Sequence, residues 1–115
     1  MTINLDDLPD EKIRRMMDYT MAAGSLTRGR HDFRIPFFVV NDWAKHGYCV
    51  LSTNRLARQF NSTRRTMCIA IERLVAAGAI REIGRTSDKR AKFVPCLEIG
   101  DAWRAARQAR QDAAR

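Results

Sequence analysis

The spacing of apolar residues predicts an amphipathic helix near the start of the chain. Over residues 9–23, apolar side chains recur at intervals of three and four, with Pro9 in the first turn and Gly24 just after the end. The predicted inner face consists of Ile13, Met16, Met17 and Thr20 or Met21. Residues 25–32 mix arginine with turn-forming residues and have no period, so they predict a loop, either mobile or a plain linker.

A second helix is predicted over residues 35–46. Pro36 suits a first helical turn, and Gly47 suits a helix end. The apolar stripe of this helix consists of Phe37, Val40, Trp43 and Ala44. A short buried strand is the alternative, because residues 38–40 have high strand propensity. The regular stripe favours the helix, and residues 48–51 then predict a short extended segment.

Two short helices joined by a tight turn are predicted next. Ser52 is a favourable N-cap, and Leu51 can pack on Leu56 to fix how the chain enters the first of these helices. The inner face of this helix, which runs through residue 60, is Leu56, Ala57 and Phe60. Residues 61–63 supply a turn and a second N-cap, Thr63. The apolar residues of the second helix, which ends before Gly78, are Met67, Ala70, Ile71 and Leu74.

A β-hairpin and a final helix complete the pattern. Residues 79–84 predict one strand, residues 85–92 a basic tip, and residues 93–99 a returning strand that Pro95 confines to a sheet edge or a bulge. Residues 101–115 are rich in alanine and predict a helix whose apolar face is thin beyond Trp103. The expected fold class is mainly α with a small β-hairpin (α+β), and 115 residues suit one domain.

Composition excludes several classes of protein. The chain has 45% hydrophobic and 30% charged residues, which is typical of a folded globular domain. Its longest apolar run, residues 35–40, is far shorter than the roughly 20 residues of a membrane-spanning helix. The first residues are acidic, whereas a secretory signal begins with positive charge. We therefore expect a cytoplasmic protein with no membrane partner.

Neither a metal centre nor a catalytic motif is predicted. Cys49, Cys68 and Cys96 are widely spaced and odd in number, so we interpret them as reduced, structural thiols. His46 and Cys49 could share a helical face and bind a metal, but no second close pair accompanies them. The sequence has no phosphate loop, paired carboxylate motif or nucleophile with a base. We expect a protein that is not an enzyme and has no cofactor.

The positive charge is concentrated in one segment. The chain has a net charge of +8, and between Trp43 and Lys92 eleven Lys or Arg residues face only Glu72, Glu82 and Asp88. The remaining residues are therefore neutral overall. A concentrated basic surface attracts phosphate backbones because binding releases counterions. Such a distribution is typical of proteins that bind nucleic acid or an anionic membrane surface. The motif that follows favours nucleic acid, so the expectation of no membrane partner stands.

The predicted order of elements is that of a winged helix-turn-helix domain. Residues 51–81 resemble the DNA-reading half of bacterial winged helix regulators, such as the GntR and MarR groups, and of plasmid or phage replication initiators. The residues that carry the resemblance are Leu56, Ala57, Phe60, Thr63–Thr66, Leu74 and Ala77–Ile80. It implies a helix and loop over residues 1–33, a winged helix domain over 34–99, and a C-terminal helix over 100–115.

In such a domain the second helix of the pair, here residues 63–77, enters the major groove, and the hairpin, here residues 80–98, lies on the backbone or in the minor groove. The residues expected to contact bases are Thr63, Arg64, Arg65, Thr66 and Ile69. Those expected to contact the DNA backbone are Ser52, Asn54, Arg55, Arg58 and Ser62. Those expected in the wing are Arg85, Thr86, Ser87, Lys89, Arg90 and Lys92. Cys68 and Ile69 depart from the family pattern, which is more polar there. Ile69 would touch thymine methyl groups or pack against residues 25–32.

The predicted function is sequence-specific binding of double-stranded DNA by a small bacterial transcriptional regulator. Replication initiation, or another accessory role for a plasmid, phage or other mobile element, is an alternative that the sequence does not separate from it. A winged helix that docks on a protein is the alternative from another class. No small-molecule effector is expected. A homodimer is expected if the DNA site is palindromic, and the side chains that would form its contact, or instead close the core, are Met16, Met17, Met21 and Trp103.

Overall fold

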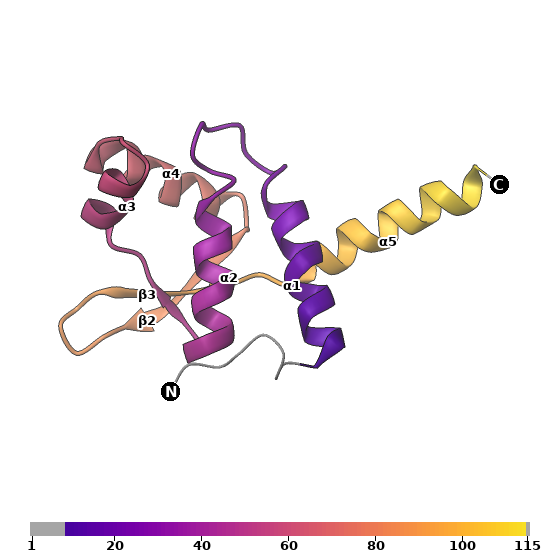
Figure 1. Ribbon diagram of the computed structural model, residues 1–115, viewed down its shortest axis with the longest axis horizontal. Helices are drawn as coiled ribbons and strands as arrows, with labels where there is room; N and C mark the ends of the chain where they lie inside the picture. Colours follow the sequence, from indigo (N-terminus) through magenta and orange to yellow (C-terminus); the bar gives the residue numbers. More distant parts are fainter. Residues whose placement is uncertain (1–8, 115) are drawn as a thin grey trace.

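Five helices and a small antiparallel sheet make up residues 9–114, the part of the chain that the computed structural model describes (Figure 1). The helices are α1 (Asp10–Ala23), α2 (Ile35–His46), α3 (Thr53–Gln59), α4 (Arg64–Ala76) and α5 (Glu98–Ala113). The strands are β1 (Cys49–Val50), β2 (Ile80–Arg85) and β3 (Ala91–Pro95). The prediction of an α+β fold with a β-hairpin is confirmed, and residues 35–46 form a helix rather than the alternative strand.

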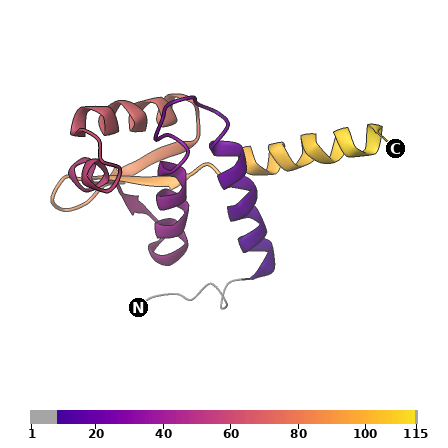
Figure 2. The same cartoon turned by 45° about the horizontal axis from the view of Figure 1, so that its top comes forward.

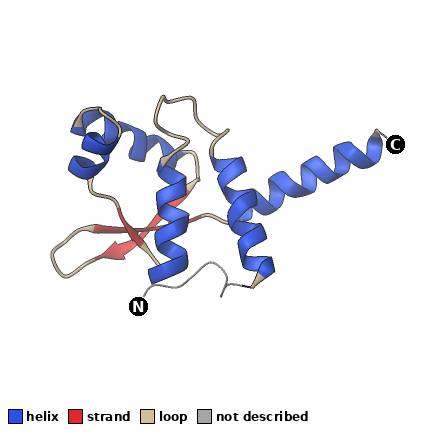
Figure 3. Ribbon diagram, viewed as in Figure 1, coloured by secondary structure: helices blue, strands red, loops and turns tan. Residues whose placement is uncertain are grey.

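The sheet has the strand order β1-β3-β2, so β3 is its central strand (Figure 3). The prediction of a returning strand over residues 93–99 was partly wrong: β3 begins at Ala91 and ends at Pro95, and Glu98 already starts α5. Pro95 pairs with Ile80 of β2, but β1 pairs only with Lys92 and Phe93. The proline therefore lies at the end of the central strand, not at a sheet edge. Its missing N–H costs no hydrogen bond to β1, because β1 is too short to reach this position.

The core joins α1, α2 and α4 to the sheet. Tyr19 of α1, Ile35 of α2, Leu74 of α4 and Ile80 of β2 are fully buried in one cluster. The Tyr19 hydroxyl donates a 2.8 Å hydrogen bond to the carbonyl oxygen of Ala79. Burial of its ring raises the pKa of Tyr19 far above its usual value. This buried bond ties α1 to the connection between α4 and β2.

Local capping signals determine the α3–α4 pair. The Ser52 hydroxyl accepts a hydrogen bond from the Arg55 amide, and the Thr63 hydroxyl accepts one from the Thr66 amide, as expected for N-caps. Asn61 closes α3 in the left-handed region at φ 51°, which asparagine tolerates better than most residues. The Ser62 amide then donates to the Ala57 carbonyl at 2.8 Å. Each helix of the pair therefore has a satisfied end, which fixes the angle between them.

The helix α5 packs against α1 and then projects from the body (Figure 2). Contact is closest at Gly100, which is buried against the backbone of Tyr19. Beside it, Arg15 pairs with Asp101 at 2.7 Å, and Asp18 pairs with Arg14 and Arg104. The α1–α5 contact is therefore formed by backbone approach and ion pairs, which suits the thin apolar face predicted for this helix.

Two predicted helix faces were partly wrong, although Met16 of α1 and Val40 and Ala44 of α2 are buried as predicted. On α1 the buried residues are Met16, Asp18, Tyr19, Ala22 and Ala23, whereas the predicted inward residues Met17 and Met21 are exposed. On α2 the predicted inward residue Phe37 is 54% exposed, and Val39 is fully buried instead. In both helices a neighbouring stripe fits the helical period equally well, and packing against the sheet and α5 selects it.

Candidate nucleic-acid interface

The first turn of α4 presents the predicted base-contacting residues to solvent. Thr63, Arg64, Arg65 and Thr66 are exposed, while Met67, Ala70 and Leu74 hold the opposite face of α4 in the core. The Thr63 hydroxyl also donates to the Thr66 hydroxyl at 2.9 Å, so both threonines are engaged in the cap. Neither Arg64 nor Arg65 forms an ion pair with any residue that the structure describes. Their guanidinium groups are available to an external anion.

Cations at this position are unfavourable for the helix itself. The N-terminal end of a helix carries partial positive charge, so acidic residues stabilise a first turn and basic residues destabilise it. The first turn of α4 has two arginines and no acidic residue. Residues 43–71 contain five Lys or Arg residues and no Asp or Glu. An anion bound in front of α4 would accept hydrogen bonds both from the exposed amides of the helix end and from these guanidinium groups.

The helix α3 and the hairpin line one depression together with α2 and β1. Ser52, Arg55 and Leu56 of this region line a hollow of about 210 Å³ together with Arg90, which precedes β3. Arg55, Arg58 and Asn54 are all exposed. Ser52 and Ser62 are half-buried, and Ser52 is used as the cap of α3. The structure thus brings Arg55 and Arg90, from two predicted contact sets, to the same hollow.

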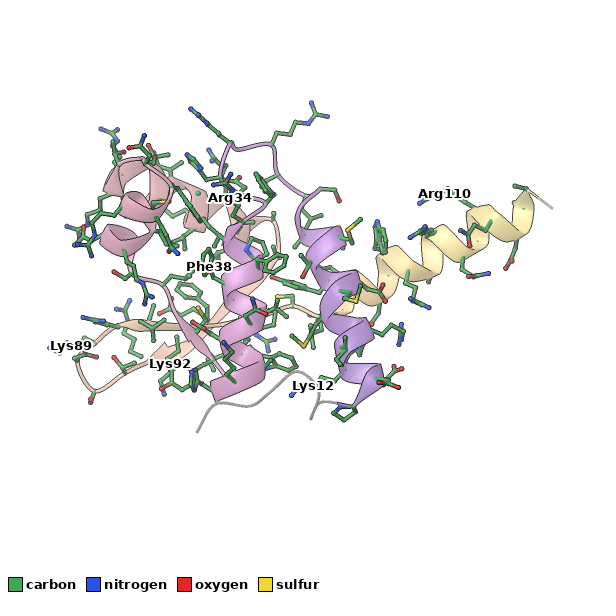
Figure 4. All side chains as sticks on the ribbon, viewed as in Figure 1. Lys12, Arg34, Phe38, Lys89, Lys92 and Arg110 are labelled. Carbon is green, nitrogen blue, oxygen red and sulfur yellow. The ribbon has the colours of Figure 1, made fainter. Side chains whose placement is uncertain are left out.

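The hairpin tip is a hydrogen-bonded turn that carries the predicted wing residues. The Lys89 amide donates to the Thr86 carbonyl at 2.9 Å, and the Thr86 amide donates to the Arg90 carbonyl at 2.8 Å. Figure 4 places Lys89 at the outer end of the hairpin. Ser87 is also exposed there. The tip therefore holds its polar side chains on an ordered turn.

Carboxylates offset part of the charge of this wing. Arg85 lies 3.6 Å from Glu82, and Arg90 pairs with Asp88 at 3.2 Å. The ammonium group of Lys92 lies 4.6 Å from the centre of the Tyr48 ring, near the base of the hairpin. Lys89 has no ion pair among the described residues. The net positive charge of the wing is thus smaller than a count of its basic residues suggests.

Ile69 lies on the outer surface of α4. Its side chain is 41% exposed, so residues 25–32 do not bury it. Cys68 beside it is half-buried, Cys49 is fully buried, and all three cysteines are free thiols. Burial raises the pKa of the Cys49 and Cys96 thiols. Ile69 is consequently an apolar side chain within an otherwise polar exposed surface.

No sequence pattern predicted the position of the connection between α1 and α2. Asp32, at the end of the predicted mobile loop or linker, is 1% exposed and accepts two 2.9 Å hydrogen bonds from Arg73 of α4. The His31 ring stacks on Phe60, the C-cap of α3, at 5.5 Å between centroids. The connection is therefore held against both helices. Arg73, one of the eleven basic residues between Trp43 and Lys92, has its charge matched by Asp32.

The pair of Asp32 and Arg73 predicts a pH dependence of stability. Burial alone would raise the pKa of Asp32, but the hydrogen bonds and positive charge of Arg73 outweigh it, so the pKa lies below the usual 3.8. A carboxyl group with a lowered pKa in the folded state stabilises the fold at pH values above its unfolded pKa, and this contribution is lost as the pH falls through the folded pKa.

We therefore expect Asp32→Asn to lower the free energy of unfolding at pH 7 by about 2 kcal/mol, because two charge-assisted hydrogen bonds are weakened. The difference from the parent should begin to shrink as the pH falls below about 4, the pKa of an unfolded aspartate, and should continue to shrink as the pH falls through the lower pKa of the folded carboxyl group. Urea denaturation at several pH values measures this. Asp112→Asn, an exposed change on α5, is the control and should have little effect at any pH. A constant deficit for Asp32→Asn down to pH 2 would contradict the assignment.

Exposed apolar side chains gather on another part of the surface. Met21, Phe33, Phe37, Phe38 and Phe60 line an open groove of about 480 Å³ between α1 and α2. Of the side chains considered for a dimer contact or for the core, Met16 is buried, Trp103 is half-buried, and Met17 and Met21 are exposed. Met16 thus belongs to the core, while the other two methionines extend the apolar surface.

Comparison with models of protein families, with curated proteins and with solved structures found no match. Among residues 9–114 there is no group of three or more His, Cys, Asp or Glu side chains arranged to hold a metal ion. None of the helices in the described part of the chain is long and apolar enough to cross a membrane. The case for function therefore rests on the geometry and charge of α3, α4 and the hairpin.

Proposed function

We propose that this chain binds double-stranded DNA as a winged helix protein. Its elements α2, β1, α3, α4, β2 and β3 follow one another in the order of that domain, with α1 and α5 as additions at the two ends. In this proposal α4 enters the major groove by its first turn, α3 crosses the backbone, and the hairpin reaches the flanking phosphates. Regulation of transcription is the biological use that we propose for this binding.

The observation that carries the proposal is the pair of exposed arginines at the start of α4. Arg64 and Arg65 have no acidic partner among the described residues, and they stand where the helix dipole disfavours cations. Sequences retain locally unfavourable choices mainly where function requires them. Two guanidinium groups on an exposed helix end can form paired hydrogen bonds with guanine or with phosphate.

The test is fluorescence anisotropy of a labelled random duplex titrated with the protein at several salt concentrations. Contacts from α3, α4 and the hairpin should give a slope of about −4 or steeper in log K against log salt, because each neutralised phosphate contributes about −0.9. A single strand of the same length is the control and should bind more weakly. Absence of binding at about 0.02 M salt, or equal affinity for the single strand, would refute the proposal.

Protein docking is the second candidate, and the observation that favours it is the apolar groove between α1 and α2. Exposed apolar surface of this kind marks contact sites on many proteins. The two candidates are separated by the pair Phe33→Ser and Phe37→Ser, since both side chains are exposed on the groove and neither belongs to α3, α4 or the hairpin. If the DNA proposal is correct, a monomer of this double variant binds duplex DNA with the same affinity as a monomer of the parent.

A further inference from the structure

The connection between α1 and α2 contacts α4, so it is held by more than the two helices that it joins. Figure 1 shows residues 24–34 at the top of the view, next to α4, while the β2–β3 turn lies at the lower left. Asp32 anchors this connection through its two hydrogen bonds to Arg73, and His31 anchors it through its stack on Phe60. One anchor lies on the last turn of α4, and the other lies on the C-cap of α3.

Gly29 shows how closely the backbone of the connection approaches this anchor. A Cβ atom at position 29 would collide with Nη2 of Arg73 and with the carboxylate of Asp32. The Asp32 amide in turn donates to the Gly29 carbonyl at 3.2 Å. The backbone on both sides of Gly29 is therefore positioned by the Asp32–Arg73 pair, because no room remains for it to shift toward α4.

The residues on either side of Gly29 are arginines. Arg28 and Arg30 are both exposed, and neither forms an ion pair with a carboxylate of the described residues. The two cations thus lie on a segment beside α4. The carboxylate of this segment, Asp32, is already paired with Arg73. Their positive charge adds to that of α3 and α4 and lies on a different side of α4 from the hairpin tip.

We propose that Arg28 and Arg30 form a fourth contact with DNA, in addition to those of α3, α4 and the hairpin, on the phosphates beside the groove that α4 enters. This inference rests on the proposed DNA binding and adds a contact that the sequence pattern did not predict. A phosphate contact needs a cation without an internal partner, held at the edge of the recognition surface. Because the connection is already ordered by its anchors, little conformational entropy is lost when the two side chains engage a phosphate.

The test compares the salt dependence of duplex binding by the parent with that of Arg28→Ser combined with Arg30→Ser. We expect the slope of log K against log salt to become shallower by about 1 to 2, and the affinity at about 0.15 M salt to fall on the order of tenfold. Both side chains are exposed, so the thermal midpoint should not change. The pair Arg28→Lys with Arg30→Lys keeps the charge and should keep the slope.

A matched control removes the same charge elsewhere. Arg107→Ser combined with Arg110→Ser acts on α5, whose projecting half carries Arg110 on the opposite side of the molecule from the hairpin (Figure 4). This control should keep the parent slope. If the parent binds with a steep slope and the variant at positions 28 and 30 keeps it, the fourth contact is refuted and the proposed function stands. If the parent itself does not bind the duplex, the proposed function fails, and this inference fails with it.

Discussion

Replacing Arg64 and Arg65 by alanine is expected to reduce affinity for duplex DNA by at least about 30-fold near 0.15 M salt, since each arginine in a paired contact contributes roughly 1–3 kcal/mol. The same change should leave the fold intact or stabilise it slightly, because two cations are removed from the positive end of a helix. Loss of binding without loss of stability is the signature of residues that serve the partner rather than the fold.

The measurement is a binding titration together with thermal denaturation followed by circular dichroism. Arg107→Ala combined with Arg110→Ala lowers the net charge equally and is the control for simple loss of positive charge. We expect the control to bind within about threefold of the parent, because α5 lies away from α4 and distant charges are screened by salt. Equal losses of affinity in the two variants would mean that only the net charge of the protein matters and that the first turn of α4 is not a specific contact.

Replacing Gly100 by alanine is expected to destabilise the protein by about 2–3 kcal/mol, the usual cost of forcing an extra methyl group into a packed contact. A Cβ atom there would lie 2.7 Å from Cα of Tyr19 and 2.8 Å from the carbonyl carbon of Asp18, and both of these are backbone atoms that cannot rotate away. The α5 helix would have to move off α1 and weaken the ion pairs of Asp18 and Asp101.

The sign of this effect is diagnostic, because alanine is the better helix former by about 1 kcal/mol and would stabilise an exposed helical position. Ala106→Gly, at an exposed position of the same helix, is the control and should cost about that amount through propensity alone. Chemical denaturation gives both free energies. An increase in stability for Gly100→Ala would show that α5 does not approach α1 as described.

Features encoded within a few residues were predicted from the sequence. The caps at Ser52 and Thr63 and the turn between α3 and α4 depend on side chains that bond to nearby amides, so their signals are local. The exposure of Arg64 and Arg65 followed from the spacing of Met67, Ala70 and Leu74, since a short helix with one buried face leaves little choice for the other.

Features that depend on distant segments were not predicted. The α2 stripe was assigned to Phe37 rather than Val39, because both fit a helical period and only packing decides between them. The pairing of β1 with β3, through Cys49 and Phe93, joins residues that are far apart in sequence. The contact between Asp32 and Arg73 likewise joins residues 41 positions apart, and no local sequence pattern predicts such a pair. The ordered connection and its two arginines could therefore not be foreseen.

We propose that the start of α4, together with α3 and the hairpin, forms the surface that binds duplex DNA. The most direct measurement is a ¹H–¹⁵N correlation spectrum of the labelled full chain, recorded while an unlabelled random duplex is added. We predict that amide shifts change over residues 52–66 and 84–92 and stay in place along α5. Shift changes confined to α1 and α5, or none at concentrations that saturate binding, would contradict the claim.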